Sequence, residues 1–244
     1  MKHLRLLKKK IISLPLFLIK KSYLMICKIR FYIVWPLLKP KKIYYENKYF
    51  YTSLKKYTLP SKNLFSYNKI YDEFEKNLIY RNVNKNDVCI DVGANIGFYS
   101  YLFLKKVGSG GNVIAFESDY AICEILKKNF YNYNNFYCFN QSIDTSFNVQ
   151  SFSGILKKKI SFIKIDIDGA DYYALKSFEK IINRDKPKLL IELGEQSKRE
   201  HNAHYSKTVD FLKRYKYSIF EVDYNIKEFS RNLKYNEIIN IFAY

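Results

Sequence analysis

The sequence is poor in the residues that build metal sites and disulfide frameworks. Its 244 residues include four cysteines and three histidines, and no CxxC pair occurs among them. A chain of this length buries a core without disulfides, so we expect reduced, packed cysteines in a cytosolic compartment. The histidines have no zinc-ligand spacing with these cysteines. We therefore expect no structural metal.

Long apolar runs are also scarce. The run from Ile11 to Ile19 has about half the ~20 residues that a spanning helix needs, and no small-residue cleavage site follows it. Lys20, Lys21, Lys28 and Arg30 then interrupt the next apolar stretch. A secretory signal and a membrane-spanning segment are both disfavoured.

Acidic residues are few, 23 against 42 lysines and arginines, and the formal net charge is +19. Residues 1–50 hold 13 of these cations and one acid, Glu46, so the excess is mostly N-terminal. Basic side chains interleaved with Leu, Ile, Phe, Tyr and Trp35 favour a segment, residues 1–42, that lies on an anionic membrane surface. A solvated or domain-packed basic helix and a nucleic-acid-binding arm are the alternatives.

Apolar periodicity divides the chain into three regions. We expect a basic apolar arm over 1–50, a helical lead-in over 51–86 with its helix at 63–81, and a domain over 87–244. The predicted strands of the domain are 87–93, 112–117, 135–141, 160–166, 187–193, 217–223 and 237–244, and the predicted helices are 97–108, 119–132, 169–183 and 205–215. This alternation predicts an α/β fold with a mostly parallel sheet, helices on both faces and an antiparallel last pair of strands.

The stretch "IDVGANIGFYS" (90–100) is typical of a strand, a glycine turn and a helix start. Gly93 and Gly97, with the free amides of a helix N-terminus, suit a nucleotide-type ligand. The middle glycine of the dinucleotide fingerprint is missing, which disfavours NAD. Glu117 ends the next strand, where a carboxylate can accept both hydroxyls of a ribose. Capping of the following helix is the alternative role for Glu117.

Four motifs, "DVGANIGFYS", "VIAFES", "FIKIDIDGADYYAL" and "LLIELGE", resemble in order and spacing the FkbM-type family of S-adenosylmethionine-dependent methyltransferases. The resemblance covers about residues 66–244. It implies the Rossmann-like class I methyltransferase fold, with a seven-stranded sheet that ends in an antiparallel hairpin. It also implies S-adenosyl-L-methionine as the cofactor.

The resemblance further implies a cofactor site in which Glu117 holds the ribose and the residues after the third strand lie near the adenine. The implied cofactor-binding residues are Asp91, Gly93, Ala94, Asn95, Gly97, Glu117, Ser118, Gln141, Ser142 and Asp166. The chain departs from the family pattern at Ser118, where Pro is usual, and at Asp168 and Asp171, where Glu is usual. The segment between 141 and 160 is short, which removes part of what would form an acceptor pocket.

The stretch "IKIDIDGAD" (163–171) places three carboxylates at a predicted strand-to-helix junction. Asp168 matches an N-cap and Asp171 an acid at the third helical position. Asp166 ends a strand that we expect to be buried, so it needs a cation. Lys164 is one candidate, and the cofactor's amino group or sulfonium region, which we favour, is the other.

The ends of the fourth and fifth strands face the ligand crevice in such sheets, which nominates Asp166, Asp168 and Glu192 as catalytic residues. A divalent ion held by these three carboxylates is an alternative. His201 and His204 lie on the next loop, where we expect a surface location.

We expect an O-methyltransferase that acts on a hydroxyl of a sugar, glycan or secondary metabolite, lipid-linked or made at the cytoplasmic membrane face. Charge and abundant aromatics make an RNA or other nucleic-acid methyltransferase the second hypothesis. Against it, the fourth strand ends in "DIDG" (166–169) and lacks the Asn/Asp-Pro-Pro-aromatic turn of base-amine methyltransferases. A non-catalytic, membrane-associated binding module is the third.

Overall fold

The structure is a computed structural model of the whole chain. It describes residues 25–26, 42–45, 47–52, 73–143, 147, 149–152, 154, 157–167, 169–194, 204–222, 226–234 and 237–244. The chain divides into two compact units, residues 1–70 and 71–244. Most of residues 1–42, the segment expected at a membrane surface, lies outside the described residues. Within the described part, no helix is long and apolar enough to cross a membrane.

The first unit contains an antiparallel hairpin of β1 (Lys42–Tyr45) and β2 (Lys48–Tyr51). Asn47 takes a positive φ of 68° in the turn, a conformation that asparagine tolerates in tight hairpins. The rings of Tyr44 and Tyr49 lie 4.9 Å apart across the two strands. The hairpin falls largely within the region expected to be a basic arm, and we did not predict it.

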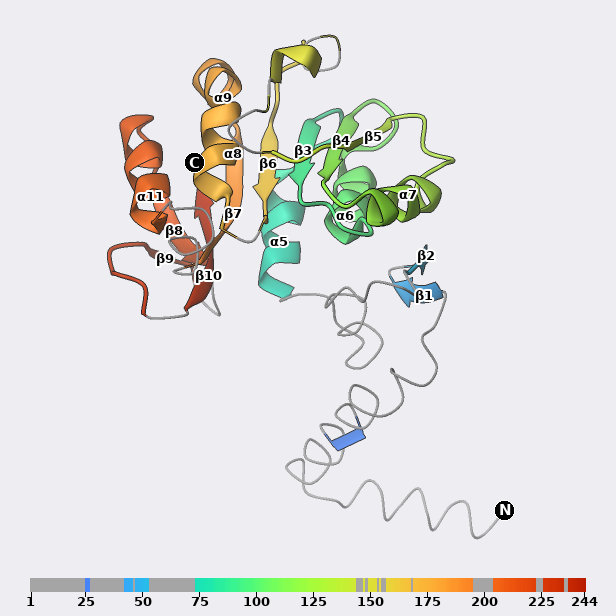
Figure 1. Cartoon of the computed structure of the whole chain (residues 1–244), viewed down its shortest axis with the longest axis horizontal. Coiled ribbons are helices and arrows are strands. Elements are labelled where there is room, and N and C mark those ends of the chain that lie inside the picture. The colour runs from blue at the N-terminus through green and yellow to red at the C-terminus, as the bar shows by residue number, and fades with distance from the viewer. Residues whose placement is uncertain are drawn as a thin grey trace. The chain divides into compact units, whose positions relative to one another are not determined.

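The second unit is built on one mixed sheet (Figure 1). Eight of the described strands form it, in the order β5-β4-β3-β6-β7-β10-β8-β9. The parallel strands are β3 (Val88–Val92), β4 (Asn112–Glu117), β5 (Phe136–Asn140), β6 (Phe162–Ile165) and β7 (Lys188–Gly194). The antiparallel strands are β8 (Ile219–Val222), β9 (Ile226–Glu228) and β10 (Ile238–Ala243). The predicted parallel core and antiparallel C-terminal pair are confirmed.

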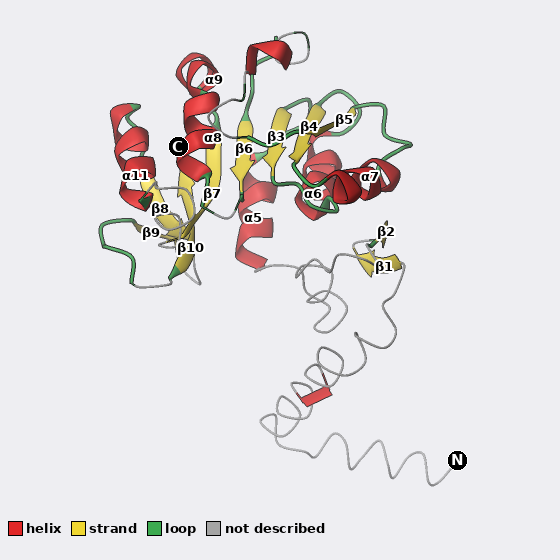
Figure 2. Ribbon diagram, viewed as in Figure 1, coloured by secondary structure: helices red, strands yellow, loops and turns green. Residues whose placement is uncertain are grey.

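Helices cover both faces of the sheet (Figure 2). One side carries α5 (Glu73–Asn82), α6 (Phe98–Val107) and α7 (Tyr120–Asn129). The other side carries α8 (Asp171–Ser177), α9 (Glu179–Asp185) and α11 (Tyr205–Arg214), and a short 3-10 helix, η2 (Val149–Phe152), precedes β6. The predicted lead-in helix is confirmed over 73–82, and its remaining predicted residues lie outside the described part.

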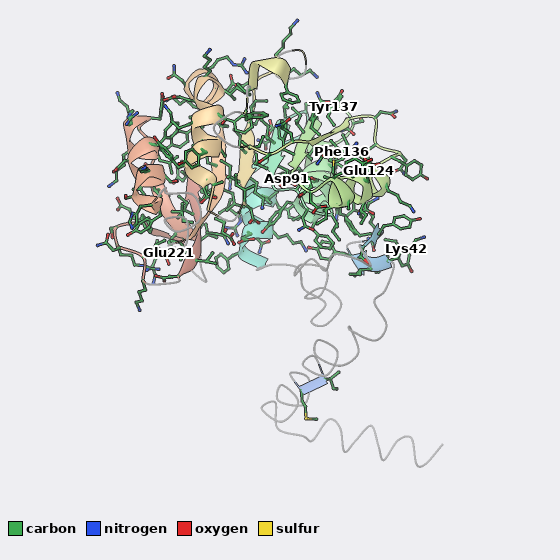
Figure 3. All side chains as sticks on the ribbon, viewed as in Figure 1. Lys42, Asp91, Glu124, Phe136, Tyr137 and Glu221 are labelled. Carbon is green, nitrogen blue, oxygen red and sulfur yellow. The ribbon has the colours of Figure 1, made fainter. Side chains whose placement is uncertain are left out.

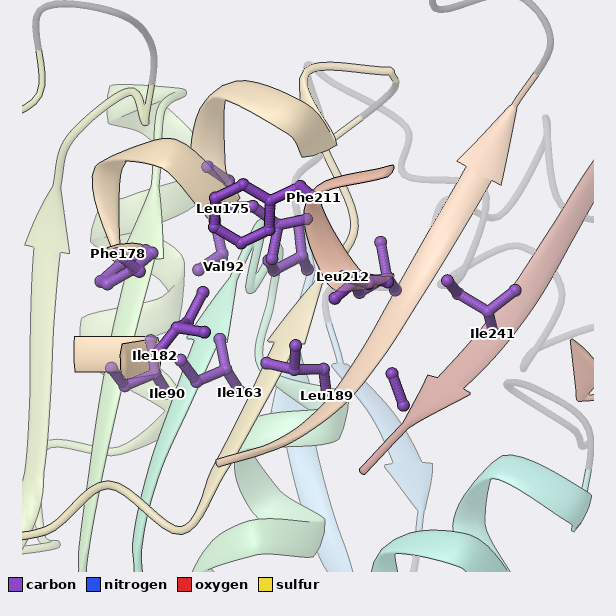
Figure 4. Packing of buried hydrophobic residues seen from close by; sticks show 14 of the residues in the cluster. Ile90, Val92, Ile163, Leu175, Phe178, Ile182, Leu189, Phe211, Leu212 and Ile241 are labelled. Atoms are coloured by element: carbon purple, nitrogen blue, oxygen red, sulfur yellow. The ribbon is translucent and has the colours of Figure 1, made fainter. Parts of the chain in front are cut away.

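A hydrophobic core lies under α8, α9 and α11 (Figure 4). Alternate strand residues enter it because successive side chains of a strand point to opposite faces. Its members include Ile90, Val92, Ile163, Leu175, Phe178, Ile182, Leu189, Phe211, Leu212 and Ile241. The other alternating set faces α5 and α6, and it carries the polar residues described below.

Two predictions need correction. The sheet has eight strands instead of seven among the described residues, because β9 turns back and pairs antiparallel with β8 at the edge. The single helix predicted over 169–183 is two helices, α8 and α9, which meet at Phe178. The Phe178 ring is fully buried and packs 6.0 Å from the ring of Phe116, so the break places a large side chain in the core.

Candidate active site

The glycine turn joins the carboxyl end of β3 to the start of α6. Gly93 and Ala94 both donate backbone N–H groups to the carbonyl of Phe116 on β4, at 3.0 Å each. Gly93 and Gly97 have φ values of 78° and 98°, in the left-handed region that glycine adopts without strain. The turn is therefore fixed to the neighbouring strand while its helix start stays glycine-lined.

The two glycines are also required by close packing. A Cβ atom on Gly93 would lie 1.9 Å from the carbonyl oxygen of Asp166, and one on Gly97 would lie 2.2 Å from the ring of Phe130. The turn thus contacts the end of β6 directly. It brings the predicted cofactor loop and the predicted catalytic carboxylate to one edge.

Asp91 is completely buried on β3, in the middle of the unit (Figure 3). Its Oδ2 accepts a hydrogen bond of 2.6 Å from the hydroxyl of Ser100 on α6. Its Oδ1 has no hydrogen-bond partner within the described residues. Burial raises the pKa of Asp91, against the opposing pull of Lys164 and Ser100. A buried acceptor atom of this kind suits a donor on a bound ligand.

Glu117 ends β4, and its side chain reaches the glycine turn. Its Oε2 accepts the backbone N–H of Asn95 at 2.9 Å, and its Oε1 accepts the N–H of Asp119 at 2.8 Å. Burial raises the pKa of Glu117, while these two backbone hydrogen bonds act to lower it. Asp119 is the N-cap of α7, with its side chain accepting from Ala121 and Ile122. Glu117 thus accepts one hydrogen bond at the start of α7, from the Asp119 N–H, as a capping residue would. It accepts the other from the Asn95 N–H and so holds the glycine turn.

The residues predicted near the adenine follow β5, the next strand outward. The N–H of Gln141 donates to the Glu117 carbonyl at 3.0 Å, and the Gln141 amide group donates to the Ser142 carbonyl at 3.0 Å. Ser118 is exposed, and its carbonyl accepts from the side chain of Asn140 at 2.9 Å. These residues gather around the end of β4.

Asp166 has its cation in Lys164. The Lys164 Nζ lies 2.8 Å from Asp166 Oδ2, and the exposed fractions of the two side chains are 4% and 28%. Burial acts to lower the pKa of Lys164, but Asp166 and Asp91 outweigh it and the pKa rises. Burial acts to raise the pKa of Asp166, but Lys164 lowers it overall. The sequence left Lys164 and the cofactor as candidates, and Lys164 is a cation that contacts Asp166 in the structure.

Lys164 belongs to a larger buried polar group between the sheet and helices α5 and α6. Its Nζ lies 4.2 Å from the ring centre of Tyr99. The Tyr99 hydroxyl donates to Glu75 on α5, and Glu75 also accepts from the side chain of Asn240 on β10. The network therefore joins α5, α6, β6 and β10 beneath the carboxyl end of the sheet.

Glu192 is on β7, the strand next to β6, and the charge of Asp166 acts on its carboxyl group. Burial, and next the charge and hydrogen bond of Asp166, raise the pKa of Glu192 to about 8. Glu192 is only partly buried, so its carboxyl group is accessible from the edge of the sheet. A neutral carboxylic acid next to an ionised one is a pattern that assigns acid and base roles.

Helix α8 begins two residues later than the helix predicted over 169–183. Helix α8 begins at Asp171 with Ala170 at its N-cap, because Gly169 has a left-handed φ of 93° that ends the preceding turn. Asp171 is thus an acid at the first helical position, where the helix dipole favours it. Asp168, predicted as N-cap and catalytic candidate, lies outside the described residues.

Among the described residues, His204 caps a helix and three cysteines are buried or partly buried. His204 is the N-cap of α11, and its Nδ1 accepts the N–H of Ser206 at 3.2 Å. Cys89, Cys123 and Cys138 are free, as expected, and the last two sulfurs lie 3.4 Å apart. Cys27 and His201 lie outside the described residues. In the part of the chain that the structure describes, no group of three or more His, Cys, Asp or Glu residues could hold a metal ion.

The residues present fit S-adenosylmethionine. A fully buried carboxylate oxygen of Asp91 faces no donor within the described residues, and the glycine turn leaves no room for a side chain. Four carboxyl groups, on Asp91, Glu117, Asp166 and Glu192, line the neighbouring ends of β3, β4, β6 and β7. Such a set of acidic hydrogen-bond acceptors suits a ligand that carries a ribose, an ammonium group and a sulfonium.

The strand order and the glycine turn define a class I methyltransferase fold. Comparison with family models then matches the methyltransferase FkbM domain to residues 139–219, which confirms the resemblance indicated by the motifs. The match supports the predicted class, the S-adenosylmethionine-dependent methyltransferases. A search among curated proteins gives no match.

Solved structures are similar to this chain at low sequence identity. Fibrillarin from Aeropyrum pernix, solved with natively bound S-adenosyl-L-methionine, is 13% identical over 70% of this chain and 74% of its own, with a TM-score of 0.51. Methyltransferase FkbM from Methylobacillus flagellatus KT is 18% identical over 67% of this chain and 44% of its own, with a TM-score of 0.45. A SAM-dependent O-methyltransferase from Thermotoga maritima is 15% identical over 72% of this chain and 65% of its own, with a TM-score of 0.46.

Proposed function

We propose that the protein transfers a methyl group to a hydroxyl of a sugar, glycan or other secondary metabolite. The observation that carries the proposal is the carboxyl pair of Asp166 and Glu192, beside the glycine turn and partly open to solvent. A hydroxyl acceptor must lose its proton during transfer, and a carboxylate within hydrogen-bond reach contributes typically 10²–10⁴-fold to such a step.

In this proposal the cofactor supplies an electrophilic methyl group, and the chain's own residues bind and align. Asp91 and the turn at 93–97 hold the methionine end, Glu117 holds the ribose, and Gln141 and Ser142 lie by the adenine. Alignment of the acceptor oxygen contributes several kcal/mol toward the barrier of a displacement reaction.

The charge of the site supports a neutral or cationic acceptor. Asp91, Asp166, Glu192 and Glu75 surround one buried cation, Lys164. Phosphate groups close to this edge would meet like charges, whereas hydroxyls and amines would meet hydrogen-bond acceptors. A nucleic-acid acceptor is for this reason the weaker alternative, although the chain as a whole is basic.

We further propose that residues 1–42 hold the protein at the cytoplasmic face of an anionic membrane, and that the acceptor is lipid-linked. The support is the sequence alone, with its dense cations between apolar and aromatic residues.

A labelled methyl-transfer assay over fractionated glycan, lipid and RNA extracts tests the function. We expect label in a glycan or lipid fraction with the wild type and with Gly154→Ala, a substitution into open space. Glu192→Gln should transfer at least 10²-fold less. Label that enters the RNA fraction alone would contradict the proposal.

A further inference from the structure

Cys123 and Cys138 form a pair of thiols that the proposed function does not use. Cys123 lies near the start of α7, and Cys138 lies in β5, a strand that α7 packs against (Figure 1). Their sulfur atoms are 3.4 Å apart, although 15 positions separate the two residues in the chain. A disulfide bond is about 2.05 Å long, so a small movement of the two side chains brings the sulfurs to bonding distance.

The two thiols differ in exposure. Cys123 has 0% of its surface exposed, whereas Cys138 is partly exposed. An oxidant in solution therefore reaches Cys138 first, and the Cys123 sulfur lies beside the product. Burial raises the pKa of both thiols, and the charge of Lys127 acts to lower it. Little thiolate is present at pH 7 as a result, and we expect a slow reaction.

The pair flanks the turn that carries Glu117. Helix α7 begins after Asp119, whose N–H donates to Glu117 Oε1 at 2.8 Å. From the other side, Asn140 at the end of β5 donates its side-chain amide to the Glu117 carbonyl at 2.9 Å. A covalent bond between Cys123 and Cys138 would join the two segments that hold Glu117 in place.

We propose that Cys123 and Cys138 are an oxidation site, which hydroperoxides convert to a disulfide that weakens the binding of S-adenosylmethionine at Glu117. The Cys138 thiolate attacks the hydroperoxide, so that a sulfur–oxygen bond forms, the oxygen–oxygen bond breaks and an alcohol leaves, or water where the oxidant is hydrogen peroxide. The Cys123 sulfur then attacks the sulfenic acid, the sulfur–sulfur bond forms, and the hydroxyl group leaves with the Cys123 proton as water. The two thiols lose two electrons and the hydroperoxide gains them. A dithiol reverses the change by thiol–disulfide exchange.

The effect on the cofactor rests on the proposed function, whereas the disulfide itself does not. With the thiols free, the Glu117 carboxylate accepts backbone N–H groups from Asn95 and Asp119 at 2.9 and 2.8 Å. Movement of the start of α7 toward β5 shifts the Asp119 N–H from this position. Loss of one such hydrogen bond corresponds to about 3- to 10-fold in affinity for a ribose that Glu117 holds.

Peptide mapping of the full-length protein tests the oxidation site. The protein is treated with hydrogen peroxide and digested with trypsin, which cuts at Lys127 and Lys128 between the two cysteines. We expect a disulfide-linked pair of peptides that contain Cys123 and Cys138, reversed by dithiothreitol, while the completely buried Cys89 stays unmodified. In Cys123→Ala, Cys138 should instead accumulate as a sulfenic acid that dimedone traps. Absence of the linked peptides from the treated wild type overturns the proposal.

Calorimetric titration with S-adenosylmethionine tests the effect on the cofactor. We expect binding to be about 3- to 10-fold weaker after oxidation and to be restored by dithiothreitol. Cys138→Ala, treated in the same way, should bind as its untreated form does. A disulfide-linked wild type with unchanged affinity overturns the effect on the cofactor. Absence of binding to the reduced wild type overturns the proposed function instead, and the peptide map still decides the oxidation site.

Discussion

Gly93 and Asp166 are in such close contact that a single added carbon would collide with backbone. A Cβ on Gly93 would lie 1.9 Å from the carbonyl oxygen of Asp166, a residue 73 positions later in the chain. The cofactor turn after β3 and the carboxyl end of β6 are therefore one structural unit. The glycine is required by this packing as well as by any ligand.

Gly93→Ala should destabilise the fold. Residue 93 has a φ of 78°, which is strained for alanine. The added methyl group would also collide with the backbone carbonyl oxygen of Asp166, which cannot rotate away as a side chain could. We expect a loss of about 3 kcal/mol in the free energy of unfolding, measured by urea titration. Gly154→Ala, which meets nothing within 4 Å, is the matched control and should change it by less than about 0.5 kcal/mol. Equal unfolding free energies for the two variants would contradict this prediction, because they would show that the turn shifts to make room for the methyl group.

Most of the sheet could be predicted because its strands are short apolar runs separated by amphipathic helices. The strand predicted at 112–117 matches β4 at both ends, and the last two predicted strands pair as expected. Strand β9 could not be predicted because its three residues are all exposed and only one, Ile226, is apolar, so the strand shows no apolar alternation. The break at Phe178 was also hidden, because a buried aromatic fits a continuous helix pattern equally well.

The sequence indicated which residues form the candidate site, but it indicated few of the contacts between them. The need of Asp166 for a cation followed from its place on a buried strand, and Lys164 was one of two candidates. The links through Glu75 and Asn240 depend on which element packs against which, and these residues are 165 positions apart. No local spacing reveals that kind of contact.

Lys164→Met should cost about 3 kcal/mol of unfolding free energy, because it leaves the buried carboxylates of Asp166 and Asp91 without their cation. The double variant Lys164→Met with Asp166→Asn should lose less than the sum of the single losses. Lys127→Met, in an exposed pair with Glu124, is the control and should cost under about 1 kcal/mol. Additive losses at Lys164 and Asp166 would contradict a direct pair.

Glu117→Gln should weaken binding of S-adenosylmethionine about 10- to 100-fold. The amide retains one acceptor oxygen, so either the Asn95 or the Asp119 backbone N–H loses its charged partner, and the ribose loses a carboxylate. Calorimetric titration measures the change. Glu124→Gln, which alters an exposed carboxylate on α7 (Figure 3), should bind like the wild type. Unchanged affinity in Glu117→Gln would confine Glu117 to a structural role.

Removal of residues 1–42 should release the protein from vesicles that contain anionic lipid. Each cation near such a surface contributes about 1 kcal/mol, and the contribution weakens as salt screens it. Co-sedimentation at low and high salt measures binding, and affinity for S-adenosylmethionine serves as the control for an intact domain. Vesicle binding that survives the deletion would place the membrane contact elsewhere in the chain.

The stability of the protein should fall as the pH rises from about 4.5 to 8, and Glu192 should account for part of the slope. Its pKa is about 8 in the folded chain, whereas an unfolded glutamic acid titrates near 4.3. Between these values the folded state binds the proton and the unfolded state does not, so each step upward in pH favours unfolding. Below pH 4 both states are protonated, so Glu192 adds nothing to the slope and its neutral form leaves the stability at its full value.

Urea titrations at pH 5, 6.5 and 8 should show a flatter profile for Glu192→Gln, which has no proton to lose. Raised pKa values elsewhere, as at Asp91, act alike in both proteins, so the difference between the two profiles belongs to Glu192. Parallel profiles would mean that Glu192 is already ionised in the folded chain at these pH values.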